Sequence, residues 1–121
     1  MTEAAKETMP TIETMNEAIA IFMGAKIDKH NRVHGLSKKG YYRVSSLIYH
    51  SSFDALMPVY EKIKSLECTY EIGVMKNMDY HFTTIIDMKK RRQLVFVPSR
   101  DPLILVAHKA AYKFIVEHYN K

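Results

Sequence analysis

The chain has 121 residues, of which 47% are hydrophobic, and this fits a single domain with one core. Its one cysteine, Cys68, excludes a disulfide within the chain, and its N-terminus, MTEAAKETMP, lacks the basic start and apolar run of a signal peptide. No apolar stretch approaches the roughly 20 residues of a membrane-spanning helix, so we expect a cytoplasmic protein. The formal net charge is +5, and part of the positive charge is gathered in basic clusters.

Residues 1–10 show no hydrophobic period, and we expect a disordered tail followed by one domain over residues 11–121. A helix is predicted to begin near Thr11 or Thr14, because Thr14 and Glu17 have the spacing of a capping box. Gly24 suits the left-handed conformation that ends many helices. Between these limits hydrophobic residues recur at helical spacing: Ile12, Met15, Ile19, Phe22 and Met23.

Residues 25–40 are polar and basic, and we expect a long loop there. A strand is predicted over residues 41–48, with Tyr42, Val44 and Ile48 on one face. In the segment 26–43 a single acid, Asp28, is outnumbered by cations: Lys26, Lys29, Arg32, Lys38, Lys39 and Arg43.

A second helix is predicted to begin at Ser51, Ser52 or Asp54, all of which are residue types that cap helices. Pro58 fits near the first turn if Asp54 is the cap, and otherwise it predicts a kink, because proline lacks an N–H and clashes with the preceding turn. The hydrophobic residues of this helix also recur at helical spacing: Phe53, Leu56, Met57, Tyr60, Ile63 and Leu66.

Three strand-like segments follow, and the short turns between them favour an antiparallel meander. Two of them, residues 68–75 and 80–88, alternate between polar and apolar residues, which assigns Phe82 and Ile86 to the buried face. The third, residues 94–97, is apolar on both faces, as is typical of a central or covered strand.

A last helix is predicted after Asp101, which would cap it, with Pro102 at the first helical position. The order helix, weak strand, helix, three strands, helix predicts an α+β fold in which helices pack on one antiparallel sheet of three or four strands. The expected shared core is Leu56, Tyr60, Ile63, Phe82, Ile86, Phe96, Val106, Ala110 and Phe114.

No catalytic, cofactor or metal site is visible, and we expect a protein that is not an enzyme. His30 and His34 form an H-x-x-x-H pair, but zinc needs three or four ligands and the pair lies in the expected loop. Cys68 alternates with apolar residues, which favours a buried thiol over a nucleophile. His81 and Asp87 are expected to face solvent.

Two basic clusters are the candidate macromolecule-binding residues. The first consists of Lys38, Lys39 and Arg43, and the second, in the turn before the last strand, of Lys89, Lys90, Arg91 and Arg92. Such clusters bind phosphate backbones or acidic protein surfaces, or they are simply solvated.

The order helix, three strands, helix is also that of double-stranded-RNA-binding domains. The last helix here begins Arg100-Asp101-Pro102 and lacks their basic start. No aromatic platform flanks the KKRR turn. The sequence therefore favours an acidic protein surface as the partner, with nucleic acid as the alternative.

Three segments are similar to a known family: NEAIAIFMG over residues 16–24, YHSSFDALMPVYEKI over residues 49–63 and DPLILVAHKAA over residues 101–111. They resemble the helix motifs of the phage ABA sandwich domain family, small proteins of phages, prophages and mobile elements, including those of gut Bacteroidetes. The segment 26–43 and the KKRR turn depart from that pattern. The resemblance implies a sandwich fold and a mobile-element origin, and it implies no catalytic residue.

We therefore expect a non-enzymatic phage or mobile-element accessory protein that binds a host or phage macromolecule. Inhibition of a host defence system, such as a CRISPR nuclease, is one form of such binding. The alternative is a nucleic-acid-binding protein, and a small hydrolase or metalloenzyme has the least support in the residues.

Overall fold

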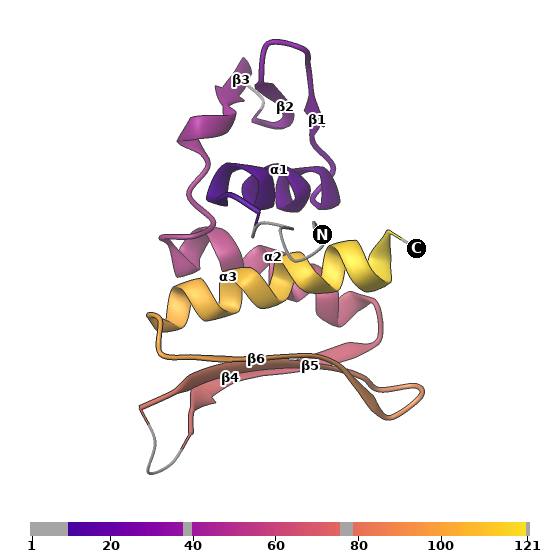
Figure 1. The fold of residues 1–121 in the computed structure, drawn as a ribbon. Coiled ribbons are helices and arrows are strands. Elements are labelled where there is room, and N and C mark those ends of the chain that lie inside the picture. The colour runs from indigo at the N-terminus through magenta and orange to yellow at the C-terminus, as the bar shows by residue number, and fades with distance from the viewer. Residues whose placement is uncertain (1–9, 38–39, 76–78, 121) are drawn as a thin grey trace, which may run out of the picture.

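The computed structural model describes residues 10–37, 40–75 and 79–120 and arranges them in layers (Figure 1). Three helices lie between two three-stranded antiparallel sheets. The predicted α+β fold class is therefore confirmed. Apart from Pro10, the expected disordered tail falls outside the described residues.

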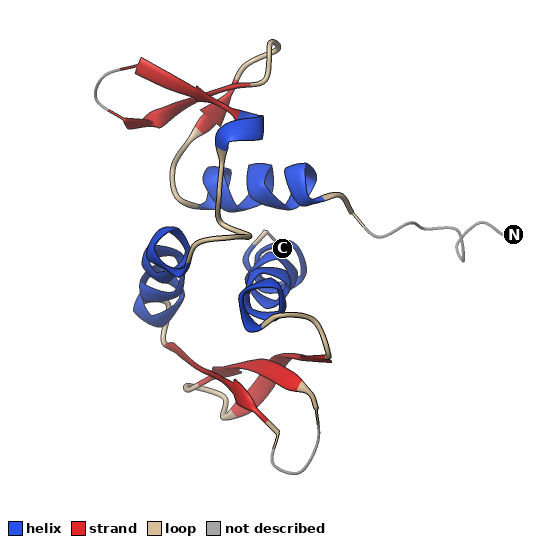
Figure 2. Cartoon of the chain, turned by 90° about the vertical axis from the view of Figure 1, so that its left-hand side faces the viewer, coloured by secondary structure: helices blue, strands red, loops and turns tan. Residues whose placement is uncertain are grey.

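The elements in chain order are α1 (Ile12–Phe22), β1 (Lys26–Ile27), β2 (Arg32–Ser37), β3 (Gly40–Arg43), the 3₁₀ turn η2 (Val44–Ser46), α2 (Phe53–Ser65), β4 (Cys68–Val74), β5 (His81–Asp87), β6 (Arg92–Ser99), α3 (Leu103–Phe114) and the π-helical turn η3 (Ile115–Tyr119). The first sheet has the order β1-β2-β3 and the second the order β4-β5-β6. Figure 2 shows α2 and α3 side by side on one face of the second sheet, with α1 between them and the first sheet. No helix in the described part of the chain is long and apolar enough to cross a membrane.

The first sheet occupies the segment that was predicted to be a loop. β1 and β2 are antiparallel with Ile27 opposite Val33, and Val33 is in turn opposite Tyr42 of β3. The loop predicted over residues 25–40 is therefore wrong, and so is the length of the strand predicted over residues 41–48. The strands are short and mostly exposed, so they bury too few side chains to produce an alternating pattern that the sequence would reveal.

The first two helices begin at capping residues that the sequence offered. The Thr11 hydroxyl accepts a hydrogen bond from the N–H of Thr14 at 3.1 Å, so α1 starts at the earlier of the two threonines. The Ser52 hydroxyl accepts from the N–H of Ala55 at 3.2 Å and caps α2. Pro58 consequently lies inside α2 rather than near its first turn.

The end of α1 confirms the role expected for Gly24. Met23 is the last residue with near-helical backbone, and Gly24 follows with φ of +103°. Only glycine adopts this left-handed region without a steric penalty from a Cβ atom. The chain therefore turns directly from α1 into β1.

The second sheet is the predicted antiparallel meander, but one part of its core was assigned to the wrong face. Ile85, Val95 and Val97 are buried under the helices, at 0, 3 and 6% exposure. Phe96 is instead 42% exposed, and Phe82 does not belong to the core cluster.

Ile86 is also outside the core cluster, so the prediction was wrong for three residues. Alternation identifies which residues of a strand share a face, but it does not identify which face the helices cover. The remaining members of the predicted core are buried as expected: Leu56, Tyr60, Ile63, Val106, Ala110 and Phe114.

Candidate functional site

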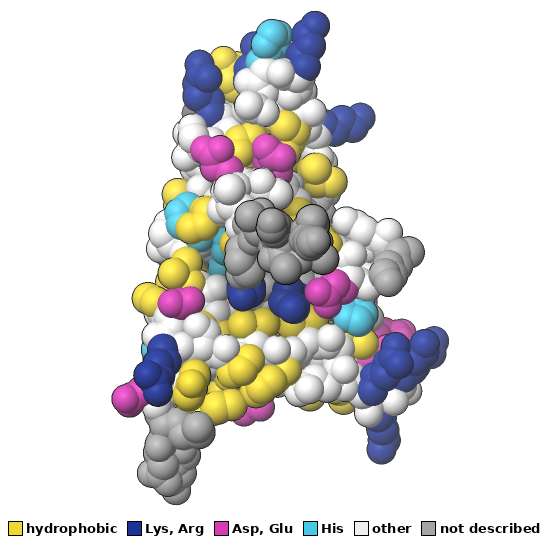
Figure 3. All heavy atoms as spheres, viewed as in Figure 1, with side chains coloured by type: hydrophobic (Ala, Val, Ile, Leu, Met, Phe, Trp, Pro, Cys, Tyr) yellow, Lys and Arg dark blue, Asp and Glu magenta, His cyan; other side chains and the backbone are white. Residues whose placement is uncertain are grey.

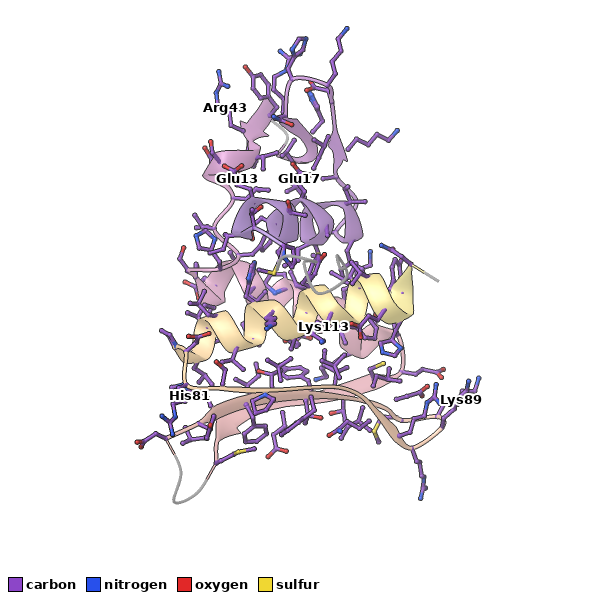
Figure 4. All side chains as sticks on the ribbon, viewed as in Figure 1. Glu13, Glu17, Arg43, His81, Lys89 and Lys113 are labelled. Atoms are coloured by element: carbon purple, nitrogen blue, oxygen red, sulfur yellow. The ribbon has the colours of Figure 1, made fainter. Side chains whose placement is uncertain are left out.

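The structure separates the two predicted basic clusters. Arg43 ends β3 in the first sheet, whereas Lys89 lies in the turn after β5, at one end of the second sheet (Figure 4). The helices lie between the two sheets (Figure 1). Lys38 and Lys39 fall outside the described residues, so the structure places only Arg43 of the first cluster.

The first sheet neutralises part of its own positive charge through Asp28. The Asp28 carboxylate accepts hydrogen bonds from the guanidinium of Arg32 at 2.8 Å and from the imidazole Nε2 of His34 at 2.9 Å. It also accepts from the backbone N–H groups of His30 and Arg32, and so closes the turn between β1 and β2. These bonds, that of His34 foremost, hold the pKa of Asp28 well below its ordinary value.

The structure gives His30 and His34 different surroundings. His34 bonds to Asp28, while His30 is exposed in the turn. Among the described residues, no group of three or more His, Cys, Asp or Glu side chains is arranged to hold a metal ion.

Arg43, the described member of the first basic cluster, lines a hollow of about 220 Å³ that is also lined by the acidic Glu13.

The second cluster has a different electrostatic setting. The Asp87 carboxylate accepts hydrogen bonds from the backbone N–H groups of Lys89 and Lys90, at 2.9 and 3.1 Å, and these bonds lower its pKa. Arg91 adopts a left-handed backbone with φ of +54°, which completes the tight turn. The turn thus presents four exposed cationic side chains, Lys89 to Arg92, at the end of the sheet, where Figure 3 shows Lys and Arg side chains gathered.

None of these four side chains forms an ion pair in the part of the chain that the structure describes. The ion pairs there join Asp28 to Arg32 and His34, and Glu117 to Lys113. The KKRR turn therefore has no ion-paired cation among the described residues, although the charge of the nearby Asp87 acts on Lys90 and Arg92; in the first sheet, Arg32 is ion-paired.

A hollow of about 350 Å³ lies on the helix side of this turn, lined in part by Lys90, Arg92, Cys68 and His118. Burial, and then the charge of Asp87, raises the pKa of the Cys68 thiol, which keeps it protonated. The His118 ring donates from Nε2 to a backbone carbonyl at 3.1 Å. This pairing of thiol and imidazole does not have the lowered thiol pKa that an activated nucleophile requires.

The other face of the second sheet is not covered by any described helix (Figures 1 and 2). Phe82 on β5 and Phe96 on β6 lie on this outer face, with ring centroids 6.3 Å apart and ring planes at 37°. We call them the aromatic pair. Sequence reasoning missed it because both residues were assigned to the core. Alternation places Val95 and Val97 on the face opposite to Phe96, but it does not show which of the two faces the helices cover.

A buried polar cluster between α1, α3 and the segment before α2 was also missed. Asn16 accepts a hydrogen bond at Oδ1 from His108 Nε2, at 2.8 Å. Its Nδ2 donates to the carbonyl of Leu47 at 3.2 Å and to Nδ1 of His50 at 3.1 Å. Burial, followed by the nearby His50, lowers the pKa of His108 to about 4. These residues connect the layers as uncharged groups, and nothing in a single sequence indicates their proximity.

No family model matches this chain, and neither the curated proteins nor the solved structures include a match to it. The resemblance to the phage ABA sandwich family thus stays a prediction, and the functional argument depends on the geometry of the second sheet.

Proposed function

We propose that this protein is a non-enzymatic nucleic-acid-binding protein whose KKRR turn, Lys89 to Arg92, contacts the phosphate backbone. The observation that supports this most is the set of four exposed cations without carboxylate partners in the described structure. Counterion release from phosphates makes such a cluster a source of affinity for any nucleic acid.

The preference for an acidic protein surface, drawn from the sequence, assumed that no aromatic residue accompanies the turn. The aromatic pair lies on the same sheet as the turn, and Phe96 is 42% exposed. Phe82 lies near the start of β5, at the end of the strand far from the turn, so the pair does not flank the turn, but it places aromatic rings on the same sheet, and on this ground we favour nucleic acid as the partner.

The arrangement also differs from the way double-stranded-RNA-binding domains use the same order of elements. Those domains contact duplex phosphates through the start of the last helix. Here Arg100 lies over the ring of Tyr80 at 5.1 Å, and the Asp101 carbonyl accepts from His81 Nδ1 at 2.7 Å. The start of α3 is occupied by these local contacts and has an acidic residue, so the turn is the stronger phosphate-binding feature.

An accessory role in a phage or mobile element, which the family resemblance implies, is the biological setting of this proposal. No catalytic step is part of it. The two groups most often recruited for catalysis, the thiol of Cys68 and the imidazole of His108, are both buried and uncharged. Binding, rather than chemistry, is the activity that these residues support.

The test is a titration of labelled single-stranded and duplex oligonucleotides over a range of salt concentrations. Replacement of Lys89, Lys90, Arg91 and Arg92 by Gln should reduce the slope of log K against log salt by roughly 0.7 per lost contact on single strands and roughly 0.9 on duplex DNA. A control replaces Lys26, Lys29 and Lys64, which are exposed and lie outside both predicted clusters. Equal effects of the two variants, or no binding by the wild type at low salt, would contradict the proposal.

A further inference from the structure

We infer that the outer face of the second sheet binds the bases of single-stranded nucleic acid, with Phe82 and Phe96 as stacking residues. This inference rests on the proposed function, in which the KKRR turn binds the phosphates of the same strand. It adds the form of the nucleic acid and the residues that would contact its bases.

The first argument is the position of the aromatic pair. Phe82 is opposite Pro98 and Phe96 is opposite Thr84, so the two rings lie diagonally on neighbouring strands. Their centroids are 6.3 Å apart and the rings are inclined by 37°. Exposed aromatic rings on a sheet are the feature with which many proteins stack unpaired bases, and such stacking is available only when bases are not paired in a duplex.

The second argument is the way the neighbouring residues hold Phe82 against the sheet. Gly73 of β4 is opposite Phe82, and a Cβ atom at Gly73 would come within 3.3 Å of the Phe82 ring. The ring therefore leans over the glycine and is partly buried by it. The edge of the ring at Cε1 and Cζ is the part that lies over Gly73, so the backbone of β4 fixes the position of this side chain.

The third argument is the distribution of charge around this face. Arg92 begins β6 and continues the KKRR turn, so positive charge stands at one end of a strand of eight residues, about 26 Å long at 3.3 Å per residue. The acidic side chain on the outer face is Glu71, on β4, the opposite edge of the sheet. A polyanion is therefore attracted to the Arg92 end of β6 and repelled from β4, and a path that continues along β6 from that end passes Phe96.

Other occupants of the face explain fewer of these observations. A second copy of the chain would bury the aromatic pair, but it would leave the four cations of the turn without a role. An acidic protein surface would pair with the turn, but it would not require an exposed Phe96 ring beside a half-buried Phe82 ring. A nucleic-acid strand accounts for both features, since its phosphates and bases alternate along one chain.

The experiment measures affinity for labelled dT and U oligonucleotides of about 12 nucleotides, within the site sizes of roughly 4–16 nucleotides of other single-strand-binding folds, and for a duplex of equal length. Phe96→Ala and Phe82→Ala should each weaken single-strand binding about tenfold, as expected for the loss of one stacked base. Phe96→Tyr should retain the affinity because its ring still stacks. Val74→Ala, which removes an apolar side chain that is 61% exposed on the same sheet, is the matched control and should have no effect.

Two further variants separate stacking from other causes. Phe96→Leu keeps an apolar side chain but loses the aromatic face, so it should weaken binding nearly as much as Phe96→Ala. This variant separates the loss of stacking from a loss of stability that the alanine replacement could cause. Glu71→Gln removes the acidic group on the outer face and should strengthen binding.

The failure of this inference is distinguishable from failure of the proposed function. If the Gln replacements at the KKRR turn abolish binding while the Phe variants bind normally, the turn binds phosphates and the inference is overturned. Equal affinity for single strands and duplex would also overturn it. If the wild type is a dimer that Phe96→Ala converts to a monomer, the face binds a second copy and the inference is likewise wrong.

Discussion

Acidification should destabilise this protein through His108, the imidazole that α3 places next to Asn16. The side chain is 1% exposed, and its Nε2–H already donates to Asn16 Oδ1 at 2.8 Å. Asn16 in turn donates from Nδ2 to Nδ1 of His50. Protonation of His108 would therefore place a charge in a buried site that offers it no carboxylate partner among the groups described here.

The sign and size of the effect follow from the pKa of His108. It is about 4 in the folded protein, against an ordinary value of 6.5, so the unfolded chain binds the proton more tightly. The stabilising contribution is complete above pH 6.5 and is lost as the pH falls from 6.5 towards 4. At about 1.4 kcal/mol per pKa unit, the loss is about 3 kcal/mol.

The assay is urea unfolding of the wild type and of His108→Gln between pH 7.5 and pH 4. Glutamine does not titrate, and its amide can donate to Asn16, so the difference between the two free energies of unfolding isolates the proton on residue 108. This difference should change by about 3 kcal/mol over the range. His30→Gln, at an exposed position, is the control and should leave the pH dependence as in the wild type. A difference between wild type and His108→Gln that is constant with pH would refute the reasoning.

Three further outcomes follow from the packing. Phe114→Ala should lower the free energy of unfolding by about 3–5 kcal/mol, because Phe114 is buried at 3% exposure. Phe96→Ala should lower it much less, because Phe96 is 42% exposed, and chemical denaturation compares the two variants. The thiol of Cys68 should resist alkylation in the native state and react after unfolding, because it is buried and its pKa is raised. Mass spectrometry detects the alkylated protein, and alkylation of the native state would contradict this prediction. EDTA should leave the melting temperature unchanged, because His34 bonds to Asp28, and a drop on chelation would show that a metal is bound after all.

The helices and the meander of the second sheet were predictable in position because local signals agree there, but the expected cap of the last helix was wrong: Pro102 rather than Asp101 is its N-cap, and α3 begins at Leu103. Two kinds of local signal agree on where these helices lie. Apolar residues recur at helical spacing, and residues typical of helix ends, such as Ser52 before α2 and Gly24 after α1, stand at the limits of the stripes. The exact start of α2 was less certain, because several good capping residues stand together and the sequence does not rank them. The cap is Ser52 rather than Asp54, and Pro58 therefore lies inside α2.

The first sheet and the outer face of the second were not predictable for two different reasons. β1 has two residues and most of the first sheet is exposed, so the segment lacks the periodic apolar signal by which strands are recognised. In β5, Phe82 and Ile86 are as hydrophobic as any core pair, whereas Thr83 and Ile85 are the residues that face the helices. Which face is covered depends on where α2 and α3 pack, and this is a tertiary property.

Only part of the candidate site could be predicted, because the face of the sheet that the helices cover is a tertiary property. The four cations of the KKRR turn can be read directly from the sequence, and the structure adds that no ion pair neutralises them within the described residues. The aromatic pair depends on the face assignment, and the separation of Arg43 from the turn depends on the layers between the sheets. Neither follows from local spacing.

The most direct test of the account is the salt dependence of binding to a single-stranded oligonucleotide, measured by fluorescence anisotropy with the wild type and the variant with Gln at positions 89–92. We expect salt-sensitive binding by the wild type, and a slope of log K against log salt that is smaller by up to about 2.8 in the variant, at roughly 0.7 per phosphate contact. Identical slopes for the two proteins, or no binding at low salt, would contradict the claim that this turn is a nucleic-acid-binding element.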